Sequence, residues 1–363
     1  MSSLHVVIAP DSFKGSIAAR PAAEAIAAGW AAARPGDRIT LIPLADGGEG
    51  TADVIASAVP GSVWHEVPGV RGPDSRPVDA RWLRLPDGTA VVDLATASGL
   101  PLMGSPGPLG AHTFGLGQVI SAALGTGCRA LVIGLGGSAS TDGGTGLLAA
   151  LGARFLDAEG RDLPLGGEAL ADLARIDLTG LRPAPAGGVT CLTDVRSPLC
   201  GPAGAAALFG PQKGAGPDEI AALDHALAVL AAHLGGDPQQ PGTGAAGGTG
   251  YGLSAGWGAR LEPGARAVAA LAGLPAALAE ADLVITGEGC FDATSLAGKV
   301  AGTVLGLAAE TRTRAAIVAG VLGAEPPCPA VALAHLAGSA SAAMNDPARW
   351  LSAAGEHLAR ATT

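Results

Sequence analysis

Short apolar runs that end in glycine-rich or acidic loops, each followed by a helical segment, constrain the fold of this chain most strongly. Residues 4–9 form a predicted buried strand that runs into a loop at Pro10, and an alanine-rich helix follows. Residues 39–44 form a second predicted strand, followed by a glycine loop and a helix that begins near Thr51. Units of strand, loop and helix predict a parallel sheet with helices on its faces.

The middle of the chain has a different pattern. From about residue 69, apolar and polar residues alternate across a Pro-Asp-Gly turn, which predicts an antiparallel hairpin. The earlier rhythm returns near the C-terminal end in the runs "ADLVITGEG", "RAAIVAG" and "AVALAHLAG". The chain has 363 residues, more than one hydrophobic core usually holds. We therefore predict an α/β fold with a discontinuous parallel-sheet domain, residues 1–68 plus 275–363, and a second α/β domain inserted over 69–274.

Composition and charge exclude several classes of function. The net charge is −10 and no basic patch occurs, which argues against nucleic acid or an anionic membrane surface as a partner. No run approaches the roughly 20 apolar residues of a membrane-spanning helix, and the N-terminus lacks the features of a signal peptide. Five scattered cysteines without paired spacing are typical of a reduced cytoplasmic protein without structural zinc.

A lysine in the first loop raises a specific question. The loop "APDSFKGS" contains Asp11, Ser12, Lys14 and Ser16, and the chain has only three lysines among its 22 basic residues. A lysine kept in a chain that otherwise uses arginine is expected where a guanidinium does not fit, as a point charge aimed at a phosphate or carboxylate. The alternative is an ordinary solvated surface lysine.

Two further loops carry acids at strand ends. Asp46 and Glu49 lie in "ADGGEGT", where they could hold a hard cation through oxygen ligands, or Glu49 could instead cap the helix that follows. The loop "ITGEGCFDATSLAGKV" contains Glu288, Asp292 and Lys299. A glutamate between two glycines has little structural explanation, so we favour a functional role for Glu288.

The loops of the middle segment offer an anion cradle and a further acid. Residues 133–146, "IGLGGSASTDGGTG", expose backbone N–H groups ahead of a helix, and this favours phosphate over NAD because the dinucleotide pattern is incomplete. Asp194 follows another strand, and it is either a base, a metal ligand or an acid of the turn before Pro198. Lys213 lies in a Gly-Pro-Gln-Lys-Gly loop. The Gly/Pro stretch over 235–250 fits a flexible linker or an ordered loop.

Five segments together resemble one family. "APDSFKGS", "ADGGEGT", "GLGGSASTDGGTG", "CLTDVRSPLCGP…FGPQKGA" and "ITGEGCFDATSLAGKV" occur in the order found in the type I glycerate kinases, over about residues 4–340. Thr193 and Arg196 depart from the usual form of the fourth segment. The resemblance implies ATP-dependent phosphorylation of D-glycerate to 2-phosphoglycerate or 3-phosphoglycerate. It also implies a flavodoxin-like, Rossmann-like domain with a second domain inserted, and an ordered loop over 235–250.

The roles of single residues are our own hypotheses from phosphoryl-transfer chemistry. We assign catalytic roles to Asp194, Lys14 and Lys213, and we expect ATP and Mg²⁺ to bind in a cleft between the two domains. The expected ligands of the metal are Asp46, Glu49 and Asp292. The expected substrate and phosphate contacts are Asp11, Ser12, Ser16, Gly136, Gly137, Ser138, Ser140, Thr141, Glu288 and Lys299.

Two other functions stay open at this point. One is a kinase of another sugar or polyol acid, and the other is a non-enzymatic ligand-binding regulator of similar fold. In each case we expect small-molecule partners, no nucleic acid, no membrane, and a cytoplasmic monomer or homodimer.

Overall fold

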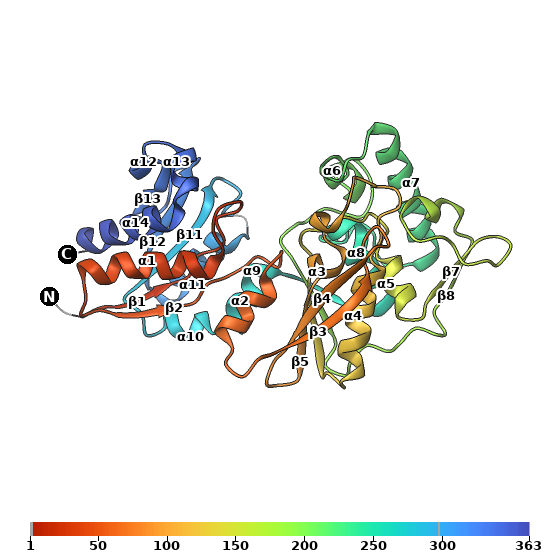
Figure 1. Cartoon of the computed structure of the whole chain (residues 1–363), viewed down its shortest axis with the longest axis horizontal. Coiled ribbons are helices and arrows are strands. Elements are labelled where there is room, and N and C mark those ends of the chain that lie inside the picture. Colours follow the sequence, from red (N-terminus) through yellow and green to blue (C-terminus); the bar gives the residue numbers. More distant parts are fainter. Residues whose placement is uncertain (1–2, 297, 363) are drawn as a thin grey trace. The chain divides into compact units, whose positions relative to one another are not determined.

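The computed structural model describes residues 3–296 and 298–362, and they form two compact units (Figure 1). Unit 1 contains residues 1–46, 53–60 and 263–363, and unit 2 contains residues 47–52 and 61–262. Both units mix helices with parallel strands, which confirms the predicted α/β class. The predicted domain boundaries, 68/69 and 274/275, stay a prediction; the first lies inside strand β3 (Val63–Arg71).

The sheet of unit 1 is entirely parallel, with the strand order β13-β12-β11-β1-β2. It joins strands from the two ends of the chain, because β1 pairs directly with β11. The strands are β1 (His5–Ile8), β2 (Arg38–Leu41), β11 (Leu283–Phe291), β12 (Arg314–Leu322) and β13 (Ala330–Ala332). The helices are α1 (Ala19–Ala33), α2 (Thr51–Ala58, of which the first two residues belong to unit 2), α9 (Gly264–Leu271), α10 (Leu274–Leu278), α11 (Val300–Thr311), α12 (Leu333–Ala337), α13 (Ala340–Asn345) and α14 (Pro347–Ala361).

Helices from opposite ends of the sequence pack together in unit 1. Helix α1, red in Figure 1, lies against α14, which is blue. Their backbones approach closely at two glycines: a Cβ on Gly29 would lie 1.8 Å from the Ser352 carbonyl oxygen, and a Cβ on Gly355 would lie 2.2 Å from the Ile26 carbonyl oxygen. The small alanine and glycine side chains therefore allow the two helices to pack closely against each other. Trp30 of α1 is fully buried in the core of unit 1.

The main sheet of unit 2 is mixed, with the order β10-β9-β6-β5-β4-β3. Strands β5, β6 and β9 run parallel, whereas β3, β4 and β5 are joined as antiparallel neighbours, which confirms the predicted hairpin. A two-stranded sheet pairs β7 with β8. The strands are β3 (Val63–Arg71), β4 (Pro77–Arg84), β5 (Thr89–Asp93), β6 (Ala130–Gly134), β7 (Arg154–Leu156), β8 (Arg175–Asp177), β9 (Val189–Thr193) and β10 (Arg260–Pro263).

The helices of unit 2 pack around this sheet. They are α3 (Ala95–Ser98), α4 (Phe114–Gly125), α5 (Thr145–Ala150), α6 (Ala205–Phe209), α7 (Pro217–Leu234) and α8 (Ala245–Trp257), with 3₁₀ turns η1 (Leu100–Leu102), η2 (Glu168–Asp172) and η3 (Pro211–Lys213). The core contains apolar side chains of β5, β6, α4 and α7. The Gly/Pro stretch over 235–250 leads into α8 and is ordered, with three successive left-handed residues at 246–248.

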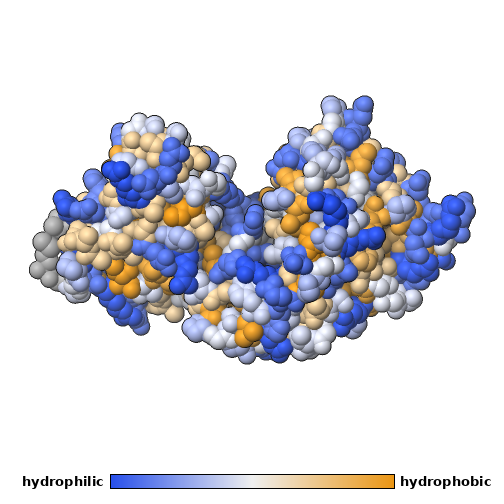
Figure 2. Space-filling model, viewed as in Figure 1, coloured by the Kyte–Doolittle hydropathy of each residue, from blue (hydrophilic) through white to orange (hydrophobic). Residues whose placement is uncertain are grey.

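Two sequence predictions for unit 1 differ in detail. Strand β1 matches the predicted run over 4–9, but β2 ends at Leu41 instead of Leu44. Ile42 and Leu44 nevertheless donate to the Ile8 and Pro10 carbonyl oxygens, so the chain stays bonded to the β1 segment beyond the end of the regular strand. No helix in the described part of the chain is long and apolar enough to cross a membrane. On the face shown in Figure 2, hydrophilic and hydrophobic residues are mixed.

Candidate active site

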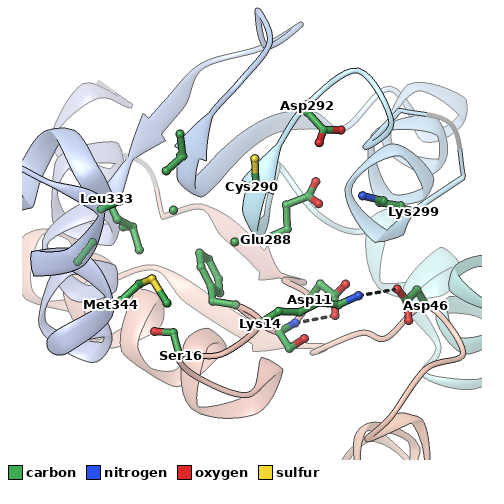
Figure 3. A pocket seen from close by; sticks show the side chains of 17 residues that line it. Asp11, Lys14, Ser16, Asp46, Glu288, Cys290, Asp292, Lys299, Leu333 and Met344 are labelled. Atoms are coloured by element: carbon green, nitrogen blue, oxygen red, sulfur yellow. Dashed lines mark hydrogen bonds and ion pairs between the residues drawn. The ribbon is translucent and has the colours of Figure 1, made fainter. Parts of the chain in front are cut away.

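A pocket of about 330 Å³ opens at the carboxyl edge of the unit 1 sheet (Figure 3). Asp11 follows β1, Glu288 lies in β11, and Val321 lies near the end of β12. Crevices outside the carboxyl ends of parallel strands are the usual ligand sites of open α/β sheets. The structure thus brings eight of the predicted site residues together within unit 1: Asp11, Ser12, Lys14, Ser16, Asp46, Glu288, Asp292 and Lys299.

Lys14 lies at the entrance of the pocket. Its Nζ is 3.7 Å from Oδ2 of Asp46, and its side chain is 82% exposed whereas that of Asp46 is 12% exposed. The expected reason for keeping lysine, a site too tight for a guanidinium, therefore receives no support from burial in this conformation. An exposed ammonium beside the pocket can still reach an anionic ligand, so the predicted phosphate or carboxylate contact stays a prediction.

Asp11 has the most strongly perturbed carboxyl group of the pocket. Burial, together with the nearby carboxylate of Asp46, raises its pKa from 3.8 to about 7. The backbone N–H of Ser12 donates a hydrogen bond to Oδ1 at 2.6 Å and opposes this increase. Lys14 also opposes the increase, and Glu288 adds to it. The group is thus poised near neutrality, where it can hold or release a proton or respond to a bound cation.

Glu288 is only 7% exposed, and its Oε1 atom is buried without a hydrogen-bond partner. Burial raises the pKa of this carboxyl, while a hydrogen bond from Ser295 and the charge of Lys299 lower it. Buried polar atoms in proteins are rarely left without a partner, because each one costs about 1–3 kcal/mol. An unpartnered acceptor in a pocket is therefore free to accept a hydrogen bond from a donor that enters the pocket.

Asp292 stabilises its own loop. Its Oδ1 accepts hydrogen bonds from the backbone N and the Oγ1 of Thr294, at 2.7 and 2.6 Å, and its backbone N donates to Ser295 Oγ at 2.9 Å. The hydrogen bond from the Thr294 hydroxyl is the main reason that the pKa of Asp292 is lowered. This geometry accounts for Asp292 as a turn residue ahead of α11.

The remaining lining of the pocket is apolar, and sequence reasoning did not identify it. Figure 3 shows Leu333 and Met344 on one side of the pocket, Lys299 and Asp46 on the other, and Glu288 between them. Met344 is 53% exposed and Val321 is 39% exposed. The apolar wall consists of Phe13, Val321, Leu333, Ala340, Ala343 and Met344. Its only sequence signal was an ordinary apolar stretch near the C-terminal end.

No group of three or more histidine, cysteine, aspartate or glutamate side chains in the described ranges could hold a metal ion. The three acids expected to form a metal site are therefore not gathered into one cluster: Asp46 and Asp292 line the pocket, whereas Glu49 is an exposed residue of unit 2. A magnesium ion that bridges substrate phosphates needs only one or two carboxylates, since water completes its shell. Asp11 and Asp46 fit that requirement, because a cation would relieve the repulsion between them.

The glycine loop of unit 2 lies mostly inside the unit. Ser140 and Thr141 are fully buried and Ser138 is 8% exposed, whereas Gly137 is exposed and Gly136 half-buried. A Cβ on Gly136 would lie 2.3 Å from Cα of Gly48, so the loop packs directly on the "ADGGEGT" segment. The predicted phosphate cradle stays a prediction, and only its glycine tip is accessible here.

Lys213 is a buried support of this loop. Its side chain is 3% exposed, and its Nζ donates to the Ser140 carbonyl oxygen and, over 3.5 Å, to Thr141 Oγ1. Burial lowers its pKa to about 8, although the charge of Asp142 opposes this. Lys213 therefore positions this loop, and the catalytic role assigned to it from the sequence stays a prediction.

Two buried aspartates that sequence reasoning missed hold the loops in place. Asp142 accepts hydrogen bonds from the N and Oγ1 of Thr113, each 2.8 Å, and from Gly144 and Gly146. Asp93, at the end of β5, accepts from the backbone N of Ala52 at the start of α2. Asp142 interrupts a run of small residues and Asp93 ends an apolar strand, and these were the available signals. Asp194 directly follows β9, as predicted from the sequence, and it is exposed; its role stays a prediction.

Comparison with known proteins identifies the family. The model of the glycerate kinase family matches residues 6–363. The chain is 41% identical to glycerate kinase of Bacillus subtilis (88% of this chain, 85% of the relative) and 41% identical to glycerate 2-kinase of Escherichia coli (82% and 80%). A crystal structure assigned as glycerate kinase 2 of Salmonella typhimurium LT2 superposes with a TM-score of 0.85 at 37% identity, over 99% of this chain and 98% of the other. The chain therefore belongs to the glycerate kinase family and is an ATP-dependent kinase.

Proposed function

We propose that this kinase transfers the γ-phosphoryl group of ATP to the 2-hydroxyl of D-glycerate and forms 2-phosphoglycerate. The observation that carries the proposal is the similarity to the Escherichia coli protein named glycerate 2-kinase, which extends over 306 residues at 41% identity. The location of the pocket, at the carboxyl edge of a parallel sheet, supports a small-molecule substrate. Use of ATP supports the expected cytoplasmic location, which stays a proposal.

Phosphoryl transfer depends on positioning and on neutralising negative charge. In this chain, Lys14 and Lys299 are the cations beside the pocket that would contact anionic groups of the substrates. Asp11 and Asp46 would hold Mg²⁺, which when bound supplies positive charge between the phosphate groups. The raised pKa of Asp11 supports this assignment, because a bound cation would favour its ionised form.

Orientation of the attacking hydroxyl requires a carboxylate or another acceptor. We keep Asp194 in this proposed role, because it is exposed directly after β9 and so is accessible to a substrate. Lys213 and Asp142 would contribute indirectly, since they hold the glycine loop of unit 2 in one conformation.

The direct test is to incubate the protein with D-glycerate and MgATP and to identify the product by ³¹P and ¹³C NMR. We expect 2-phosphoglycerate together with stoichiometric ADP. Formation of 3-phosphoglycerate would contradict the assignment of the hydroxyl, and ATP consumption only with another sugar or polyol acid would contradict the assignment of the substrate. L-glycerate, assayed in parallel, controls for stereospecific recognition.

A further inference from the structure

We infer that the pocket of unit 1 is the nucleotide site of this kinase, with the base on the apolar wall, the ribose at Glu288 and the phosphates at Lys299. The inference rests on the proposed function, which identifies ATP as the phosphoryl donor. It adds the site at which ATP binds. The pocket has two chemically different walls with a buried acceptor between them (Figure 3).

The apolar wall of the pocket favours a ligand with an apolar surface. Met344 and Val321, from α13 and β12, line the pocket and are 53% and 39% exposed. D-glycerate carries a carboxylate and two hydroxyls on three carbons, so it has almost no apolar surface to cover them. A purine base has a broad flat face that removes such side chains from water, and thioethers pack well on aromatic rings. The volume of about 330 Å³ also suits a nucleoside better than a three-carbon acid.

The unpartnered atom of Glu288 defines what lies next to that wall. A carboxylate oxygen only accepts hydrogen bonds, so the group missing from Oε1 is a donor. Ribose hydroxyls are donors, and they sit between the base and the phosphates of a nucleotide. Glu288 has the same intermediate place, between the apolar wall and Lys299 (Figure 3). Its burial makes the contact selective, because a ligand without the hydroxyl would leave the carboxylate unsatisfied.

The opposite end of the pocket suits phosphate. Lys299 is the N-cap residue of α11, a helix of 12 residues, so its ammonium and the positive end of the helix dipole occupy the same region. Phosphate groups bind readily at such helix N-termini. Lys14 adds a second cation at the entrance. The order of apolar wall, buried acceptor and cationic end thus follows the order of base, ribose and phosphates.

Calorimetric titration of the full chain with ADP and MgCl₂ tests the base contact. Met344→Gln keeps the length of the side chain but removes its apolar surface, and we expect it to weaken ADP binding about three- to tenfold. Binding of inorganic tripolyphosphate should stay unchanged. Leu208→Gln is the matched control, because Leu208 is 52% exposed and belongs to α6 of unit 2. Unchanged ADP binding in Met344→Gln, or an equal loss for tripolyphosphate, would overturn the placement of the base.

Comparison of ADP with 2′,3′-dideoxy-ADP tests the ribose contact. We expect the wild type to bind the dideoxy nucleotide about tenfold or more weakly, and Glu288→Leu to bind both with similar affinity. Equal binding of the two nucleotides by the wild type would refute the contact even if the variant failed to fold. These titrations contain no glycerate, so a failure of the proposed reaction would appear separately, as missing phosphoglycerate in the NMR assay.

Discussion

Replacement of Asp11 by asparagine should stabilise the protein at alkaline pH, because it removes a buried charge that has two acidic neighbours. An increase of the pKa from 3.8 to about 7, at about 1.4 kcal/mol per pH unit, corresponds to about 4 kcal/mol. A carboxyl with a raised pKa in the folded state binds more protons there than in the unfolded chain. Its contribution to stability is therefore fully present below pH 4 and is lost as the pH rises through 7.

Urea unfolding followed by far-UV circular dichroism, at pH values from 4 to 8.5 without added Mg²⁺, measures this effect. The free energy of unfolding of Asp11→Asn minus that of the wild type should increase by about 4 kcal/mol between pH 4 and pH 8. Asp172→Asn, at an exposed position of η2, is the control and should show no such trend. A pH-independent difference for Asp11→Asn would refute the reasoning that burial and Asp46 destabilise the ionised form.

Three further predictions concern the supports of the fold and the proposed chemistry. Burial lowers the pKa of Lys213 from 10.5 to about 8. The free energy of unfolding of the wild type, measured with urea, should therefore increase by about 3 kcal/mol relative to that of Lys213→Met between pH 8 and 10.5. A difference in the free energy of unfolding that does not change with pH would contradict this prediction. Gly29→Ala should lower the free energy of unfolding by about 1–3 kcal/mol, because the new methyl group forces α1 away from α14. Gly36→Ala, where nothing lies within 4 Å of the added Cβ, should leave the stability unchanged. Thermal unfolding measures both. Asp194→Asn should lower turnover about 10²- to 10⁴-fold with unchanged ATP affinity, and a matching loss of ATP affinity would point to nucleotide binding instead.

Local sequence patterns determined much of the architecture, because strands, turns and loops depend on short-range preferences. The apolar run at 4–9 predicted β1, and the Pro-Asp-Gly turn predicted the β4–β5 hairpin. Glycine and acidic loops after apolar runs predicted where functional groups would gather, since parallel strands present their carboxyl ends at one edge. Long loop motifs also sufficed to predict the family.

Tertiary structure alone decided which of these groups face a ligand. Asp11 and Glu288 are 277 residues apart in sequence, yet they share one pocket because β1 pairs with β11. Ser140 and Thr141, in contrast, are fully buried, and Lys213, more than 70 residues along the chain, donates to the Ser140 carbonyl oxygen and to the Thr141 hydroxyl. Burial and pKa shifts arise from contacts between distant segments, so no local pattern could reveal them. The apolar wall had no local signal either, because it exists only where α13 and β12 meet the charged loops of β1 and β11.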